Sequence, residues 1–289
     1  MQSVDPNIKP GIYQGIPNEA YHAGPGVGRS GLWTLETQSP AHFKYPAPVE
    51  ETAQSKAAKS FGTAAHVAVL EPEDFEKKVV KGPADRRGNK WSDLEEACKL
   101  DHRTLLTEKD FENCLALRDT VHADPFLNGI ITGGPAMVEA TGYFIDPVTG
   151  LLCRVRPDLY RKDIKVILDI KTTTNAKADD FVRSVTNLGY HFQEAFYTDG
   201  WQALDMPVDG FVFMALEKKS PFAFSVYELP PAIVEEGRVM YRRALDRHLE
   251  CQTKGEWPGY PTGVQPLEFK RWQYRYTEAP DPLDEQEAA

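Results

Sequence analysis

Two short apolar runs that carry charged residues at fixed positions constrain this chain more than any other feature. They are LLCRVRPDLY at residues 151–160 and VILDIKTTT at residues 166–174. Runs of this length and composition favour strands. Side chains alternate between the two faces of a strand, so Asp169 and Lys171 share one face and Ile170 points to the other. If the first run is the neighbouring antiparallel strand, Asp158 comes alongside, and two carboxylates and an ammonium converge on one spot.

This arrangement has a chemical meaning. Carboxylate oxygens are ligands that suit a hard cation such as Mg²⁺ or Mn²⁺, and a lysine beside such an ion can orient or help to activate a water molecule. The alternative is an ordinary surface ion pair at the end of a strand, because Asp-x-Lys is a common sequence. The Pro-Asp at the matching distance strengthens the interpretation as an active site, and the ion pair remains open as the alternative.

Size and composition are those of an ordinary soluble protein. The chain has 289 residues, of which 41% are hydrophobic and 26% are charged, so it can bury a large core. No apolar run approaches the roughly 20 residues needed to cross a bilayer, and the first residues contain no apolar signal-peptide core. We therefore expect a cytoplasmic protein with no membrane contact. The widely spaced cysteines argue against zinc and iron–sulfur sites and fit reduced thiols; they are Cys98, Cys114, Cys153 and Cys251.

The net charge of −10 does not by itself indicate an enzyme that acts on nucleic acid. Net charge is a weak guide, however, because phosphates respond to local patches of charge. Residues 77–90, KKVVKGPADRRGNK, are rich in Lys and Arg, and Arg154 and Arg156 stand beside the Pro-Asp. Each of these basic clusters has the ordinary alternative of a solvated face.

The remaining pattern predicts an α/β layout. We expect a single domain over residues 1–265, with an irregular N-terminal arm, followed by an acidic tail over residues 266–289. The expected helices cover residues 30–37, 56–70, 92–99, 107–122, 176–187, 190–204 and 231–253, and the expected strands cover residues 137–146, 151–160, 166–171, 210–218 and 222–229. This order predicts a mixed central sheet with helices on its faces.

His66 lies in the expected helix 56–70, one turn after Gly62. A single histidine in a helix is more often a core or surface group than a metal ligand. The small residues Gly62, Ala64 and Ala65 would let this helix approach a sheet closely, which allows a second interpretation. In that interpretation a neutral imidazole completes the shell of a metal ion.

Gln193 and Tyr197 are four residues apart in the expected helix 190–204, so they lie on one face of it. Taken alone, they favour ordinary packing and a surface amide. The functional alternative is that Gln193 holds a phosphate or the attacking water by hydrogen bonds.

Together these motifs resemble a known family. A histidine in G-x-x-x-H, then Pro-Asp, Asp-x-Lys and Gln-x-x-x-Tyr are similar in order and spacing to the RecE-like and lambda-type phage exonucleases of the PD-(D/E)XK nuclease superfamily, and to the nuclease domain of RecB. The segments YHAGPGVGRSGLWTLETQSPAHFKY and PADRRGNKW also look like the opening and the basic loop of RecE-type domains. The resemblance runs from about residue 12 to about residue 250. The second acid is Asp rather than the commoner Glu, which RecE-like members share.

The resemblance implies a restriction-endonuclease-like α/β core and a role for each motif residue. His66, Asp158 and Asp169 would bind Mg²⁺ or Mn²⁺, with two ions expected, and the main-chain carbonyl of Ile170 is a further candidate ligand. Lys171 would be the catalytic lysine, with Gln193 and Tyr197 as an accessory pair. The residues expected to contact DNA are Ser30, Ser39, Arg86, Arg87, Lys90, Arg154 and Arg156.

The implied activity is 5′-to-3′ digestion of linear double-stranded DNA, which leaves a 3′ single strand for recombination by an annealing protein partner. The resemblance also implies a ring-shaped homo-oligomer, a trimer or a tetramer, encoded by a phage or its bacterial host. Two alternatives remain open. One is a structure- or site-specific endonuclease on the same core, and the other is a catalytically silent DNA-binding recombination module, against which the intact acids and lysine argue.

Overall fold

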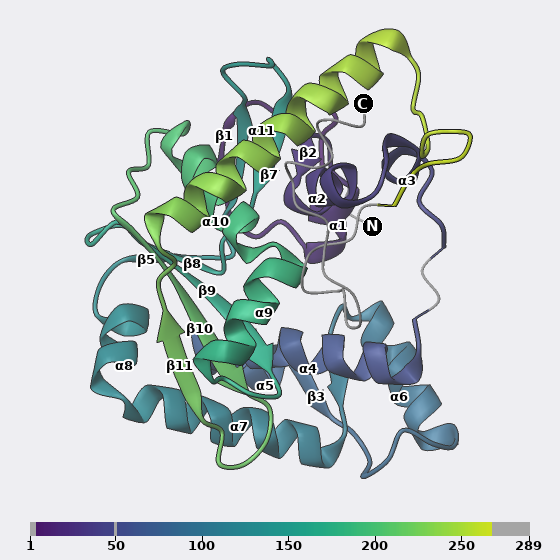
Figure 1. The fold of residues 1–289 in the computed structure, drawn as a ribbon. Helices are drawn as coiled ribbons and strands as arrows, with labels where there is room; N and C mark the ends of the chain where they lie inside the picture. Colours follow the sequence, from purple (N-terminus) through teal and green to yellow (C-terminus); the bar gives the residue numbers. More distant parts are fainter. Residues whose placement is uncertain (1–3, 49–50, 268–289) are drawn as a thin grey trace, which may run out of the picture.

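The computed structural model describes residues 4–48 and 51–267 of the chain (Figure 1). Its centre is a five-stranded mixed sheet in which β9 and β10 are parallel and the other neighbours are antiparallel. This confirms the predicted α/β fold with a mixed sheet. The strands, in their order across the sheet, are β11 (Phe224–Tyr227), β10 (Gly210–Glu217), β9 (Val166–Thr173), β8 (Leu159–Arg161) and β5 (Ala136–Val138).

Helices cover both faces of this sheet (Figure 1). A parallel pair of strands requires a crossover connection, and here α9 (Ala178–Leu188) and α10 (Tyr190–Gln202) supply it between β9 and β10. The long α11 (Pro231–Lys254) packs on α10. The opposite face carries α4 (Ala53–Leu70), α7 (Glu108–Ala123) and α8 (Pro125–Thr132).

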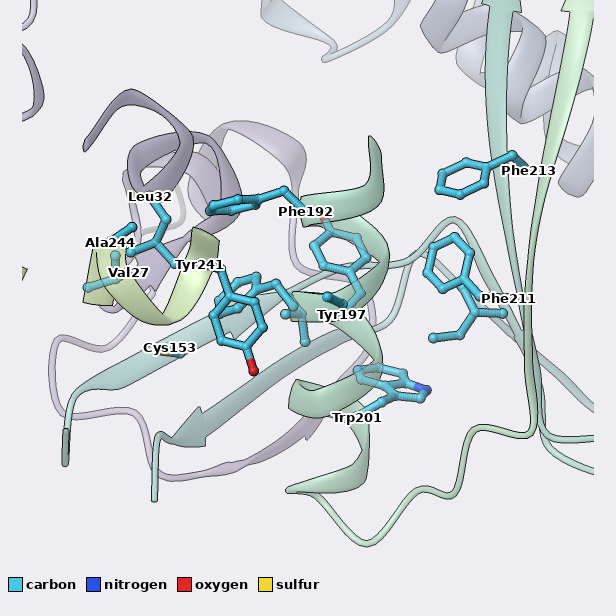
Figure 2. Packing of buried hydrophobic residues seen from close by; sticks show 14 of the residues in the cluster. Val27, Leu32, Cys153, Phe192, Tyr197, Trp201, Phe211, Phe213, Tyr241 and Ala244 are labelled. Atoms are coloured by element: carbon cyan, nitrogen blue, oxygen red, sulfur yellow. The ribbon is translucent and has the colours of Figure 1, made fainter. Parts of the chain in front are cut away.

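Two hydrophobic clusters hold these layers to the sheet. In the first, Phe192 and Trp201 of α10 and Tyr241 of α11 pack with aromatic residues of β10 (Figure 2). In the second, Ile170 of β9 and Met214 of β10 face the helices on the other side. Successive residues of each strand therefore serve different clusters, as side-chain alternation requires.

A second, four-stranded sheet lies beside the first, and its presence corrects two strand predictions. Its order is β1 (Gly11–Tyr13), β6 (Thr141–Ile145), β7 (Leu152–Val155) and β2 (Val27–Gly28). The expected strands 137–146 and 151–160 were each predicted to be continuous. Instead, the first divides into β5 and β6 and the second into β7 and β8, so that each strand serves both sheets.

The division has a local cause on each strand. Pro157 has no N–H to donate to a strand ladder, and Glu139 has a left-handed backbone with φ 44°. The N–H of Glu139 donates a hydrogen bond of 2.9 Å to the carbonyl oxygen of Asp158, so the two breaks lie opposite each other. The result is one long hairpin with a bend in its middle, and Asp158 lies at that bend.

The remaining elements are short or peripheral. Thr107 and Asp124 cap α7 and α8 by accepting N–H bonds with their side chains. A small sheet consists of two parallel strands, one before α6 in the chain and one after it. The elements not yet given are α1 (Asn18–Ala23), α2 (Arg29–Thr37), α3 (Pro40–Lys44), a 3₁₀ turn (Pro72–Asp74), α5 (Phe75–Lys78), β3 (Val79–Lys81), α6 (Asn89–Leu100) and β4 (Thr104–Leu106).

None of the helices in residues 4–48 and 51–267 combines the length and apolar character needed to span a bilayer. The predicted division into a domain over residues 1–265 and an acidic tail stays a prediction. Most of that tail, residues 268–289, lies outside the described residues.

Candidate active site

Asp169 and Lys171 project from β9 toward α10, as the strand alternation predicted. The Lys171 ammonium nitrogen lies 2.5 Å from Asp169 Oδ1 and donates a hydrogen bond of 3.0 Å to Gln193 Oε1. Gln193 Nε2 donates to Asp169 Oδ2 at 2.5 Å. Only 1% of Asp169 is exposed. Asp169 and Gln193 are buried between the sheet and α10, and 18% of the Lys171 side chain is exposed, so this set is not an ordinary surface ion pair.

Asp158 joins this set from the bend of the hairpin. Leu159 pairs with Leu168 in the antiparallel register of β8 and β9, which places Asp158 beside Asp169. Asp158 Oδ2 accepts the N–H of Ile170 at 2.6 Å. The N–H and C=O of one strand residue point to the same edge of the strand. The Ile170 carbonyl, a predicted ligand, therefore faces the Asp158 side rather than β10.

His66 reaches Asp158 from α4, and the distance between its Nδ1 and Asp158 Oδ1 is 3.5 Å. The small residues explain how the helix comes so close. A Cβ on Gly62 would lie 3.6 Å from Thr172 Oγ1 of β9, and Ala64 and Ala65 are fully buried. The structure thus brings together the histidine, both acids and the lysine that the sequence singled out.

Glu139 is a member of the site that the sequence analysis missed. It sits at the other break of the bent hairpin, and positive φ is uncommon for a residue that is not glycine. Burial raises the pKa of the Glu139 carboxyl, and the nearby Asp158 charge raises it further. The sequence contained one signal for this residue. Glu139 is a charged residue inside the otherwise apolar or neutral segment MVEATGYFID, which was expected to form a continuous strand.

The ionisable groups of the site perturb one another strongly. Burial alone would lower the pKa of His66, but Asp158, with Asp169 and Glu139, outweighs it and raises that pKa to about 9. Burial would raise the pKa of Asp158, but His66 and Lys171 outweigh it, and the net shift is downward. For Asp169, burial prevails over the lysine and the pKa rises to about 6. The acids therefore hold a protonated imidazole and an ammonium between them.

The donor types at this site fit a divalent cation. Within the described ranges, no three His, Cys, Asp or Glu side chains are grouped closely enough to hold a metal ion as they stand. Asp169 Oδ1, however, is buried and accepts no hydrogen bond of acceptable geometry, although the Lys171 nitrogen is only 2.5 Å away. A buried acceptor left in this state is costly. Binding of a cation would satisfy it and would displace the proton of His66.

The comparisons with known proteins agree with this geometry. A family model described as "PDDEXK-like domain of unknown function (DUF3799)" matches residues 31–267. The chain belongs to this family. The resemblance to the PD-(D/E)XK superfamily is thereby confirmed. A search of curated proteins gave no match.

One solved structure shares the fold of this PDDEXK-like chain. A protein of Eubacterium rectale that is provisionally named an exonuclease is 15% identical, with a TM-score of 0.58, and the match covers 96% of this chain and 99% of that one. A phage-related exonuclease of Haemophilus somnus 129PT is 12% identical over 80% of this chain and 96% of its own, with a TM-score of 0.35. An alkaline exonuclease of Laribacter hongkongensis is 11% identical over 70% and 97%, with a TM-score of 0.27. The last two similarities are too weak to carry an argument.

Tyr197 lies one helical turn beyond Gln193 on α10 of this PDDEXK-like domain. Burial raises the pKa of its phenol well above the ordinary value, and the neighbouring Tyr21 of α1 and Asp169 raise it further. Tyr197 is therefore a neutral hydrogen-bond donor at the edge of the acid cluster.

Arg154 and Arg156 bind the N-terminal arm in this structure, and their predicted contact with DNA stays a prediction. The Arg154 guanidinium donates to the carbonyl oxygens of residues 22, 24 and 25. Arg156 is only 9% exposed, and it donates to Thr141 Oγ1 and to the carbonyl of Ile16. These acceptors occupy both guanidinium groups, so the arginines fasten the arm to the second sheet.

The other predicted DNA contacts fall into two groups. Ser39 is 3% exposed, caps α3 and hydrogen-bonds to His42 Nδ1 at 2.6 Å, so its hydroxyl serves the fold. Arg86 pairs with Asp110 at 3.4 Å and lies over the Trp91 ring. Ser30, Arg87 and Lys90 are exposed, and their contact with DNA stays a prediction.

Proposed function

We propose that this chain is a metal-dependent nuclease that hydrolyses phosphodiester bonds in DNA. One observation carries the proposal: the buried Asp169, Lys171 and Gln193 set, completed by Asp158 and His66. A structural ion pair does not need a second buried acid and a histidine beside it. Clusters of perturbed ionisable groups of this kind are typical of active sites.

Each residue has a role that follows from its position. Asp158, Asp169, His66 and the Ile170 carbonyl would hold Mg²⁺ or Mn²⁺, with two ions expected. Such ions supply a hydroxide nucleophile near neutral pH and neutralise the charge of the phosphate. Gln193 bridges Asp169 and Lys171 and fixes the direction of both side chains. Lys171 would orient the attacking water, and the neutral Tyr197 phenol would donate to a phosphate oxygen.

The finer assignment is a 5′-to-3′ exonuclease on linear double-stranded DNA that leaves a 3′ single strand for recombination. It rests on the sequence resemblance to RecE-like and lambda-type enzymes, and the name of the Eubacterium rectale protein is in keeping with it. A ring-shaped homo-oligomer, a single-strand annealing partner and a cytoplasmic location in a bacterial host belong to the same proposal.

The test compares the purified protein with its Lys171→Ala variant on linear and circular duplexes of one sequence. We expect the protein to degrade the linear duplex only, in the presence of Mg²⁺ or Mn²⁺ and not with EDTA. End labels on each strand report polarity. Cleavage of the circle would replace the exonuclease with an endonuclease, and undiminished cleavage by the Lys171→Ala variant would remove the active site from this position.

A further inference from the structure

A groove that shares helix α4 with the candidate active site gathers basic side chains from several segments. It has a volume of about 330 Å³ and lies between α4, α6 and the start of β4. Two acidic residues, Glu51 and Glu95, line it. Its cationic lining residues are Lys56, Lys59, Arg86, Lys99 and Arg103.

Helix α4 connects this groove to the catalytic centre. Lys59, Thr63 and His66 follow one another at spacings of four and three residues, so they lie along one face of the helix. Lys59 and Thr63 line the groove, whereas His66 contacts Asp158. At 1.5 Å per residue, Lys59 is roughly 10 Å from His66 along the helix axis. That is about three base-pair steps along the axis of duplex DNA.

The charge of the groove opposes that of the whole chain. The net charge of the chain is −10, yet five cations and only two acids line this groove. Lys59 is paired with Glu51 at 3.2 Å, a partly exposed pair of the kind that contributes little. Arg86 is paired with Asp110, and Arg103 donates to the carbonyl oxygen of Glu76. Within residues 4–48 and 51–267, Lys56 and Lys99 form no ion pair. The groove thus has uncommitted donors for an anion.

We propose that this groove binds the phosphate backbone of one DNA strand as the strand continues from the catalytic centre. The inference rests on the proposed nuclease function. A volume of this size accommodates a nucleotide-sized part of one strand rather than a duplex. The one aromatic ring in the lining, Trp91, is 6% exposed and lies under Arg86, so bases cannot stack on it. Contacts to phosphate alone carry no sequence information, and the groove therefore binds any sequence.

The test replaces three groove cations together, in a Lys56→Gln, Lys59→Gln, Lys99→Gln variant. Binding of a fluorescent single strand of about 15 nucleotides, a length within the range of single-strand sites, is measured in EDTA at several salt concentrations. Each lost phosphate contact should flatten the slope of log affinity against log salt by about 0.7 for a single strand, hence by about 2 for the variant.

The matched control is a Lys9→Gln, Lys162→Gln, Lys219→Gln variant, which loses the same charge from exposed positions outside the groove. Its slope should equal that of the unmodified protein. Equal slopes for the groove variant and the unmodified protein, or an equal loss in both variants, would overturn the proposal. Because EDTA prevents cleavage, these slopes do not depend on the nuclease proposal, which the Lys171→Ala comparison tests separately.

A second measurement places the strand directly. All four native cysteines are buried, but Cys98 lines the groove, so it is first replaced by serine in every variant of this measurement. Thr63→Cys in that background then presents one accessible thiol at the groove. A strand that carries a thiol-reactive group on one phosphate should crosslink to this variant, and unlabelled DNA should compete. A Lys162→Cys variant is the control. Crosslinking at equal rates in the two variants would show that the strand takes another path.

Discussion

Asp169 and Glu194 are both buried acids, but only Asp169 belongs to the proposed active site, so the two can be compared. Asp169 is 1% exposed and Glu194 is 6% exposed. Burial raises the pKa of Asp169 to about 6 and that of Glu194 to about 8. Asp169 has Lys171 and Gln193 as partners, whereas Glu194 Oε2 has no hydrogen-bond partner among the described residues.

The difference shows that a raised pKa alone does not identify a catalytic group. Glu194 is next to Gln193 in the chain, yet it forms no ion pair with Lys171; burial raises its pKa most, and the charges of Glu228 and Asp169 raise it further. Burial of the charged Glu194 carboxylate destabilises the folded state, and no ion pair among the described residues offsets that cost. Asp169 carries a similar burial cost, but a cation, an amide and a second acid surround it. The partners therefore indicate function, and four variants can break or sharpen this contrast.

The largest effect is expected for Asp169→Asn. The change keeps the shape of the side chain and removes the charge that a metal ion requires. Cleavage of linear duplex should fall at least about 1,000-fold, or about 4 kcal/mol of activation free energy. The rate of the Glu194→Gln variant should stay near that of the unmodified protein. Equal losses in the two variants would abolish the distinction between these acids.

His66→Ala should act next most strongly, and on metal dependence rather than on DNA binding. The imidazole contacts Asp158 directly and belongs to the proposed ligands. Half-maximal activity should then need about 10–100-fold more Mn²⁺, a range typical of disturbed metal sites. The measurement is a Mn²⁺ titration of cleavage, with DNA affinity in EDTA as the control. An unchanged titration would show that His66 is an ordinary packing residue and not a metal ligand.

Glu194→Gln should stabilise the protein in a pH-dependent way. Because the folded-state pKa is raised from 4.5 to about 8, folded and unfolded chains are both protonated at low pH, and the carboxyl then costs nothing. As the pH rises between these values the unfolded state loses its proton first, and stability falls. The variant should match the unmodified protein near pH 4 and exceed it by about 4 kcal/mol near pH 8. Denaturant unfolding at both pH values measures this.

Glu139→Gln should have the smallest effect of the four. Its carboxyl lies near His66 and Asp158 and adds negative charge that helps to keep His66 protonated. Removing this charge should lower cleavage about tenfold, or about 1.4 kcal/mol. A change as large as that of Asp169→Asn would make Glu139 a full member of the metal-binding set. No change would leave it as the residue that shapes the bend.

The positions of Asp169 and Lys171 could be predicted from the sequence because they follow from the alternation of side chains along a strand. Asp169 and Lys171 are two residues apart on a strand, and alternation alone gives their shared face. The approach of His66 also followed from local sequence, since Gly62 and the alanines beside it leave room for β9.

The remainder depended on long-range geometry that no local pattern contains. Arg154 and Arg156 are near Asp158 in sequence, but their acceptors are backbone carbonyls of residues 16–25, more than 100 positions away. The bend needs a break in each of two strands at opposite positions. The sequence indicates only one of these breaks, through Pro157. Glu139 was missed because its importance comes from that opposition and not from its own strand.

The bent hairpin has one further consequence, which concerns how activity could be tuned. Asp158 belongs to a strand that starts in the four-stranded sheet, whereas Asp169 belongs to the five-stranded one. The β8–β9 register holds Asp158 beside Asp169, and the chain enters that register from the bend next to the four-stranded sheet. We expect substitutions that disturb the four-stranded sheet, at Thr141 or in β1 for example, to shift Asp158 relative to Asp169 at the proposed metal site. Selectivity between Mg²⁺ and the larger Mn²⁺ could then be adjusted from a distance, with every catalytic side chain left intact.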